Sequence, residues 1–231
     1  MERIRKFSLF SLLSLLLFVT LVVAGCQQAL LTALVLVNGT DVKPKYDLLL
    51  KGEKRVAVVC RSMASNPYDV QNAPREIARQ ISKLIDINVR NKKLKVVEPV
   101  KIETWLDNCN NDFDNFLEIG RDKTINADLV IGIEIRGFQI RDPHSPYMVQ
   151  GKCQVNVKVV DCSNGEVLVS EDVMIIDPPN LPISGGSGME AAFRPRFIQV
   201  VAEQIAILFH HHDQHKSRRI DADNLDMHRL Q

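Results

Sequence analysis

The side chains best placed to do chemistry are the histidines of a run near the C-terminal end, His210-His211-His212-Asp213-Gln214-His215. His211 and His215 are four residues apart, so on a helix both rings would lie on one face and could share a metal ion. The core carries no Cys/His cluster with ligand spacing that would complete such a site. We therefore interpret the histidines as a solvated helix end, where cations oppose the helix dipole. The sequence predicts no metal and no other cofactor.

Four cysteines in the body of the chain could act as free thiols or form disulfides: Cys60, Cys109, Cys153 and Cys162. Cys153 and Cys162 fall near opposite ends of one expected strand, and nine residues at about 3.3 Å each lie far beyond disulfide reach. Any bridge therefore joins them to other partners, and the pairing stays open. A thiol-dependent or metal-dependent enzyme rests on these cysteines and the histidines alone.

Two further motifs depart from the pattern of a catalytic or ligand-binding site. Gly185-Gly186-Ser187-Gly188 is followed by Met189 where a nucleophile elbow requires glycine, and it lacks the lysine of a phosphate loop. We interpret it as a flexible linker. Asp107, Asp112 and Asp114 lack the glycine and terminal glutamate of a calcium-binding EF-hand loop, so we expect caps and turns there.

A fifth cysteine, Cys26, follows a secretory signal: three cations precede an apolar run from Phe7 to Val23. The small residues Ala24 and Gly25, after Val23, allow a peptidase to approach the backbone. Val23-Ala24-Gly25-Cys26 resembles the lipobox of bacterial lipoproteins, which implies removal of residues 1–25 and acylation of the Cys26 thiol, with palmitate among the chains. Each buried CH₂ adds about 0.8 kcal/mol of membrane affinity. Gln27, in place of an aspartate, implies the outer membrane, facing the periplasm.

The mature chain then divides into three parts. Residues 26–45 form the lipidated cysteine and a tether, which is unusually apolar from Ala29 to Val37. Residues 46–212 suit one domain, and residues 213–231 form a charged tail. Without residues 1–25 the chain has 26 Lys and Arg against 27 Asp and Glu, a net charge near −1. No field of one sign steers this chain to nucleic acid.

The hydrophobic pattern of the domain predicts an α/β fold with a mixed sheet flanked by helices. A continuous apolar run indicates a strand buried on both faces, and polar–apolar alternation indicates an antiparallel strand with one solvated face. The expected order is β-α-β-α-α-β-β-β-α, with strands at 55–60, 94–97, 128–135, 152–161 and 167–176 and helices at 75–89, from 99, 113–125 and 189–209.

Four residues are expected to have structural roles in packing and turns. Gly120 within a helix costs about 1 kcal/mol relative to alanine, which indicates close packing on a neighbour. Gly132 in a strand likewise permits a close approach. Asn164-Gly165 predicts a tight hairpin with positive φ at both residues.

The motifs also resemble an envelope-lipoprotein group that includes the curli secretion component CsgG, the penicillin-binding-protein activator LpoB and the N-terminal domain of TolB. The resemblance rests on the opening strand from Arg55, on Ile119-Gly120 before Ala127-Asp128 and an apolar strand, and on a hairpin from Val157 through Gly165-Glu166. It implies protein–protein contact and no catalytic residues.

Two functions follow as hypotheses from this resemblance. The first is a membrane-anchored scaffold or regulator that binds another envelope protein through its solvated sheet face or its Pro/Gly loop. The second is a homo-oligomeric secretion channel similar to CsgG. A channel of that kind needs membrane-spanning hairpins of about 9–11 residues per strand, and Gln139 to Gln150 is a short, polar connection. The sequence therefore favours the scaffold.

Overall fold

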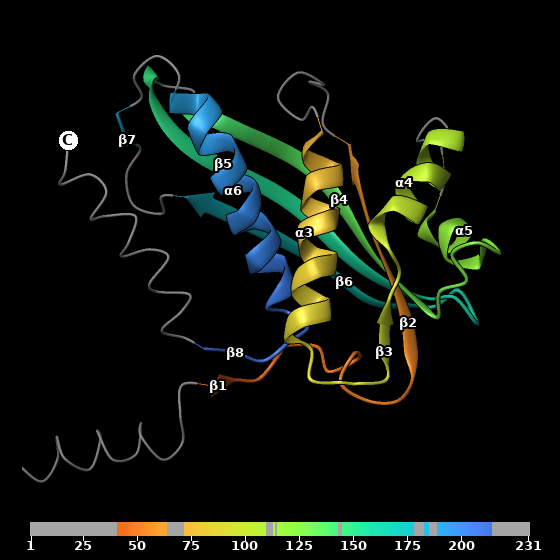
Figure 1. The fold of residues 1–231 in the computed structure, drawn as a ribbon. Coiled ribbons are helices and arrows are strands. Elements are labelled where there is room, and N and C mark those ends of the chain that lie inside the picture. The colour runs from red at the N-terminus through yellow and green to blue at the C-terminus, as the bar shows by residue number, and fades with distance from the viewer. Residues whose placement is uncertain are drawn as a thin grey trace, which may run out of the picture.

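A mixed sheet with helices on both faces forms the protein (Figure 1). The computed structural model describes residues 41–63, 72–109, 113, 115–142, 145–177, 183–184 and 189–213. Within them the principal elements follow the order β-α-β-α-α-β-β-β-α, so the predicted fold class and element order are confirmed. Among the helices of this part of the chain, none is both long enough and apolar enough to cross a membrane.

The sheet places the first strand in its interior. β2 (Lys54–Ser62) lies between β3 (Leu94–Val96) and β4 (Leu129–Asp142) and is parallel to both. β5 (Ser145–Asp161) and β6 (Val167–Asp177) continue the sheet as antiparallel strands, giving the order β3-β2-β4-β5-β6. The short β7 (Ile183–Ser184) pairs with the start of β5. The continuous apolar run of β2 thus marks a central strand.

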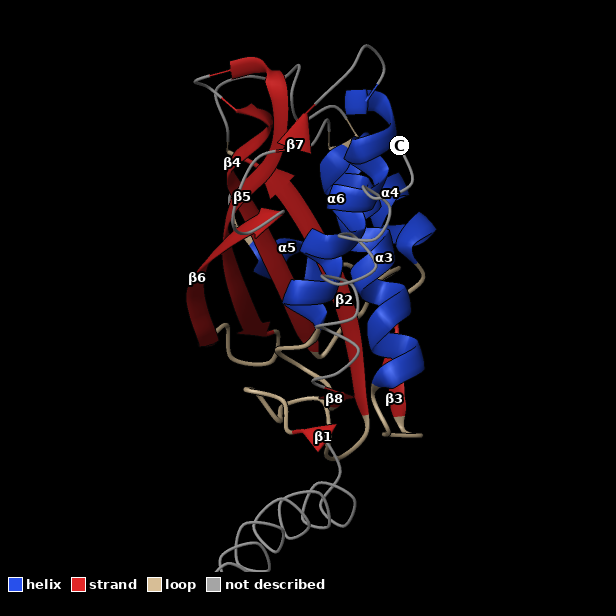
Figure 2. Ribbon diagram, turned by 90° about the vertical axis from the view of Figure 1, so that its left-hand side faces the viewer, coloured by secondary structure: helices blue, strands red, loops and turns tan. Residues whose placement is uncertain are grey.

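Two hydrophobic cores lie on opposite faces of this sheet. α3 (Ala73–Asn88) and α6 (Met189–Ala206) cover one face, where their apolar side chains meet alternate residues of β2, β4 and β5. α4 (Pro99–Asn108) and α5 (Phe116–Arg121) form the smaller core on the other face. α4 and α5 contact β2, the first part of β4 and the end of β5. On this second face α5 reaches only the end of β5, and the rest of β5 and the exposed side of β6 carry no described helix (Figure 2).

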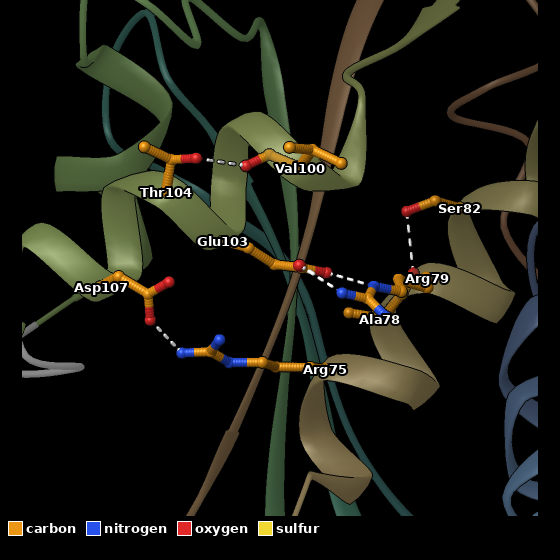
Figure 3. A network of polar contacts seen from close by, with 8 residues as sticks. All are labelled: Arg75, Ala78, Arg79, Ser82, Val100, Glu103, Thr104 and Asp107. Atoms are coloured by element: carbon orange, nitrogen blue, oxygen red, sulfur yellow. Dashed lines mark hydrogen bonds and ion pairs between the residues drawn. The ribbon is translucent and has the colours of Figure 1, made fainter.

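β3 has three residues and pairs only with the first part of β2, so the rest of this edge of β2 has no described strand beside it. Helices α3 and α4 lie along this edge. Beyond β3 the two helices meet, and Figure 3 shows the ion pairs that join them. Both nitrogens of the Arg79 guanidinium group that face α4 bind the Glu103 carboxylate, one of them at 2.5 Å, and Arg75 pairs with Asp107. These side chains shield the unpaired edge of β2 from another strand.

Two short strands tie the ends of the described chain together. β1 (Asp41–Val42) pairs antiparallel with β8 (His212–Asp213). Next to this pair the amide of Tyr46 donates a hydrogen bond of 2.9 Å to the carbonyl oxygen of Leu208. The Tyr46 ring lies 6.0 Å from that of Phe209, so the segment entering the domain is packed against the C-terminal end of the core.

Three local predictions were wrong in detail. Residues Gln139 to Gln150 are mostly strand, because β4 continues to Asp142 and β5 begins at Ser145. α5 is shorter than expected, since Asn115 caps it by accepting hydrogen bonds from the amides of Leu117 and Glu118.

The hairpin turn between β5 and β6 is the third difference. φ is positive at Gly165 but not at Asn164. The Asp161 carboxylate accepts hydrogen bonds from the amide and hydroxyl of Ser163, and the Asn164 side chain accepts one from the amide of Glu166. These local side-chain bonds widen the connection beyond a two-residue turn.

Candidate functional site

The uncovered side of β4, β5 and β6 presents a mixed apolar and polar surface. Lys152 and Gln154 of β5 lie opposite Ile176 and Met174 of β6, and register partners project from the same face of a sheet. Arg136 of β4 joins them through an ion pair to Asp172 on β6. We call the surface formed by these side chains the open face: Arg136, Lys152, Gln154, Asp172, Met174 and Ile176.

Exposed apolar side chains distinguish the open face from an ordinary solvated sheet. Met174 is 59% exposed and Ile176 39% exposed. Ile175, between them, and Val169 earlier on β6 point the other way and belong to the core beneath α6. A patch of exposed apolar groups flanked by charged ones is the composition expected of a protein-contacting surface.

A buried carboxylate, Glu134 of β4, lies beside the open face and opposite Arg61 near the end of β2. Glu134 accepts hydrogen bonds from the Lys158 ammonium group, at 2.9 Å, and from the Arg61 guanidinium group. Arg61 also donates to the carbonyl oxygen of Phe113 at 3.0 Å, and its guanidinium carbon lies 5.0 Å from the ring centroids of both Phe113 and Phe116. A buried charge is tolerated when it is paired and hydrogen-bonded in this way.

The two cations determine the ionisation of Glu134. Burial alone raises the pKa of this carboxyl. The hydrogen bonds from Lys158 and Arg61, together with their positive charges, lower the pKa by more than burial raises it. The pKa of Glu134 therefore lies below its ordinary value of 4.5. Glu134 is therefore ionised at neutral pH and joins β2, β4 and β5.

A second group of polar contacts lies next to this network, around Asn156, which lies opposite Glu134 in the register of β4 and β5. Its amide nitrogen donates a hydrogen bond of 2.8 Å to Asp172, and Arg136 lies 2.9 Å from the same carboxylate oxygen. These contacts between β4, β5 and β6 hold Arg136 and Asp172 of the open face in place. Such a surface is organised before a partner arrives, which reduces the entropy lost on binding.

Sequence reasoning missed this network, although one signal was present. Glu134 interrupts the otherwise apolar run from Leu129 to Ile135. A charge inside a strand that is buried on both faces requires a partner. Only the register of three strands shows that Arg61 and Lys158 are those partners.

The described cysteines carry free thiols, and three of them are buried: Cys60, Cys153 and Cys162. Burial raises the pKa of Cys60 well above its ordinary value, that of Cys153 to about 12 and that of Cys162 to about 11. These three thiols are protonated at neutral pH, and the thiolate is the form that acts as a nucleophile.

The two predicted packing glycines lie beneath bulky neighbours. A Cβ atom on Gly132 would lie 2.3 Å from Cδ2 of Phe116, and one on Gly120 would lie 2.3 Å from Sγ of Cys162. Both separations are far shorter than the 3.5–4.0 Å of a normal carbon contact. At these two positions the strand and the helix accept no larger residue without displacing a buried side chain.

Several predicted functional residues fall outside the described part of the chain. They are Val23, Ala24, Gly25 and Cys26 of the lipobox, the glycines at 185–188, Asp112, Asp114 and His215. The interpretation of the histidines as a solvated helix end was wrong: α6 ends at Ala206, His210 is buried, and His212 lies in β8. His211 is described and partly buried. Within the described residues no group of three His, Cys, Asp or Glu side chains is arranged to hold a metal ion. Asp107 pairs with Arg75.

Comparison with known proteins finds similarity among solved structures alone. No protein-family model matches the chain, and no curated protein sequence matches it. Lipoprotein GNA1162 from Neisseria meningitidis aligns over 66% of this chain and 97% of its own, with 16% identity and a TM-score of 0.39. The PelC dodecamer from Paraburkholderia phytofirmans aligns over 73% and 94%, with 13% identity and a TM-score of 0.39.

The C-terminal domain of LpoB from Escherichia coli is also similar, over 56% of this chain and 89% of its own, with 12% identity and a TM-score of 0.31. The solved structures similar to this chain thus include bacterial lipoproteins. Resemblance to CsgG and to the N-terminal domain of TolB stays a prediction.

Proposed function

We propose that this protein is a lipid-anchored lipoprotein of the bacterial envelope that binds another envelope protein through the open face and performs no catalysis itself. The anchor is the acylated Cys26, and the proposed location is the periplasmic side of the outer membrane. The observation that carries the binding function is the exposure of Met174 and Ile176 on the part of the sheet face that α4 and α5 leave uncovered.

The chemistry of the open face favours a protein over a small molecule. Small ligands bind in concave pockets that enclose most of their surface, whereas the open face follows the surface of the sheet. Apolar side chains on β6 supply area to bury, and Arg136, Lys152 and Asp172 surround them with charges that set orientation. Central apolar contacts with a polar rim are the usual anatomy of a protein interface.

Site-specific crosslinking in membranes tests the binding function. A photoreactive residue replaces Met174 in the full-length protein, which is produced in its own bacterium. Val100 is the matched control, because this α4 side chain is 67% exposed but lies away from the open face. We expect a discrete protein adduct from position 174 and none from position 100.

A charge placed beside the crosslinker provides the second arm of this experiment. Ile176→Glu buries an unpaired carboxylate in the interface, which should lower the adduct yield by about tenfold or more. Val100→Glu should leave the yield unchanged. Equal adducts from positions 100 and 174, or no effect of Ile176→Glu on the adduct, would refute the role of the open face.

The anchor has a separate test. The intact mass of protein extracted from membranes should correspond to a chain that begins at Cys26 and carries acyl chains on it. A chain that still carries Met1, with an unmodified Cys26, would contradict the lipobox interpretation.

A further inference from the structure

A basic surface lies at the end of the domain where the described chain begins. β1 is the first described element, and the segment from Lys43 to Glu53 follows it (Figure 1). The connection between α3 and β3 lies at the same end. The side-chain amide of Asn91 in this connection donates to the carbonyl oxygens of Leu49, at 3.0 Å, and Gly52, at 2.9 Å. The two segments are therefore fixed to each other.

Positive charge is concentrated in these two segments. Residues 41–55 and 89–95 together hold nine Lys and Arg against three Asp and Glu, a net charge of +6. The whole mature chain, by contrast, is close to neutral. We call this surface the basic end, with its exposed cations at Lys43, Lys45, Lys51, Arg90, Lys92, Lys93 and Lys95.

Two of the three acidic residues in these segments form ion pairs with cations of the basic end. Asp47 pairs with Lys51 at 3.2 Å, and Glu53 pairs with Lys95 at 2.9 Å. Lys45 pairs with Glu171. Lys43, Lys92 and Lys93 are exposed, and within the described residues no carboxylate pairs with them. These three ammonium groups are available to an external anion.

An exposed apolar side chain lies next to the cations in sequence. Ile87 is in the last turn of α3, three residues before Arg90, and it is 65% exposed. Cations with an exposed apolar residue suit a lipid headgroup layer, which accepts ammonium groups at its phosphates and apolar groups just below them.

We propose that the basic end docks on anionic phospholipid headgroups of the same membrane that holds Cys26. This inference rests on the proposed lipid anchor. Fourteen residues, 27–40, separate Cys26 from β1, and a chain of that length reaches at most about 50 Å. The anchor thus keeps the basic end near the membrane. Lysines act on lipid charge only within about a Debye length, near 8 Å at physiological salt, so docking requires this end to face the bilayer.

Docking adds a second attachment to the acyl chains. Each Lys or Arg near an anionic surface strengthens association by about fivefold. The effect fixes the orientation of the domain as well as its affinity for the membrane. The open face then points sideways into the periplasm, where a partner can reach it.

Lysine footprinting on the full-length lipidated protein tests docking. The protein is reconstituted in vesicles of phosphatidylcholine alone or of phosphatidylcholine with phosphatidylglycerol, and a water-soluble acylating reagent is applied. Mass spectrometry gives the modification rate of each lysine. We expect phosphatidylglycerol to slow modification of Lys92 and Lys93 at least fivefold, about the effect of one cation on association, with 0.5 M salt abolishing the protection. Lys101 and Lys152, away from the basic end, should react equally in both vesicles.

A charge-matched pair of variants completes the test. Lys92→Glu with Lys93→Glu should remove the protection of Lys43, whereas Lys101→Glu with Lys152→Glu, which changes the net charge equally, should retain it. Thermal melting checks that both variants are folded. Equal modification of Lys92 and Lys93 in the two kinds of vesicle would overturn the proposal. Flotation of the protein with phosphatidylcholine vesicles reports the lipid anchor independently, so failure of the anchor and failure of docking are distinguishable.

Discussion

Substitution of Gly132 by alanine tests the packing between α5 and the sheet. The added Cβ would lie 2.3 Å, 2.4 Å and 2.6 Å from three atoms of the Phe116 ring. A normal contact begins near 3.5 Å, so the ring must move by about 1.2 Å. Phe116 is buried, lies 5.8 Å from Phe113 between ring centroids and is covered by Arg61. It has little free space to move into.

The expected loss in the free energy of unfolding lies between two known effects. Overpacking a core with a shifted ring costs about 1–3 kcal/mol, and complete loss of a buried phenylalanine costs about 3–5 kcal/mol. We expect Gly132→Ala to lower the free energy of unfolding by about 3 kcal/mol. In a domain of this size that change lowers the melting temperature by about 6–12 °C.

The only tryptophan of the chain reports directly on this region. Trp105 lies 6.0 Å from Phe113 between ring centroids and donates a hydrogen bond to Asp122. Urea denaturation followed by tryptophan fluorescence therefore measures the affected cluster, and circular dichroism measures the whole domain. Gly137→Ala on the same strand is the control, because its Cβ would meet Gln154 at an ordinary 3.9 Å.

A double-mutant cycle separates steric overlap from other effects. Phe116→Leu should partly rescue Gly132→Ala, so that the double variant is more stable than the sum of the two single effects predicts. If Gly132→Ala unfolds at the urea midpoint of the wild type or of Gly137→Ala, or if Phe116→Leu brings no rescue, the reasoning from this contact is wrong.

Four further outcomes follow from the same structure. Because the pKa of Glu134 is lowered in the folded state, this carboxylate stabilises the fold at pH values above its ordinary pKa of 4.5, and the stabilisation is lost as the pH falls through the folded-state pKa. Urea titrations should show the Glu134→Gln variant to be less stable at pH 7 but less sensitive to acid below pH 4.5. Burial lowers the pKa of His210 below its ordinary 6.5, so stability from neutral His210 is present above pH 6.5 and declines below it, and His210→Asn should flatten this decline in melting temperature. EDTA should leave the melting temperature unchanged. Vesicles carrying the full-length protein should not conduct ions; a steady ion conductance would contradict the scaffold function in favour of a channel.

The sequence predicted elements whose pattern is local. The apolar run of β2, the alternation in β5 and the prolines that begin α3 and α4 specify secondary structure within a few neighbouring residues. The length of β4 and β5 was missed, because residues 139–150 mix polar and apolar side chains. Ile140 and Val149 are nevertheless buried against the main core. The pairing of β4 with β5, which a local sequence pattern does not show, determines that this segment forms strands.

The candidate site was less predictable for the same reason. The solvated face of β5 was anticipated from its alternation, but its apolar patch needs β6 beside β5 in the observed register. The Glu134 network needs three strands aligned, and the basic end combines two segments separated by more than thirty residues. Sequence patterns identify the residues in each case, and the topology of the sheet brings them together.

The β1–β8 pair has a mechanical consequence for a protein held at its N-terminal end. Tension on the tether reaches β1 first, and two residues on each strand offer few hydrogen bonds to resist it. The next firm attachment is Tyr46, which packs on Phe209. Detachment of residues 41–45 would therefore lengthen the tether by about 17 Å before any force loads the main core. With the chain held at Cys26 as proposed, the pair would act as a small reserve of length between the membrane and the folded domain.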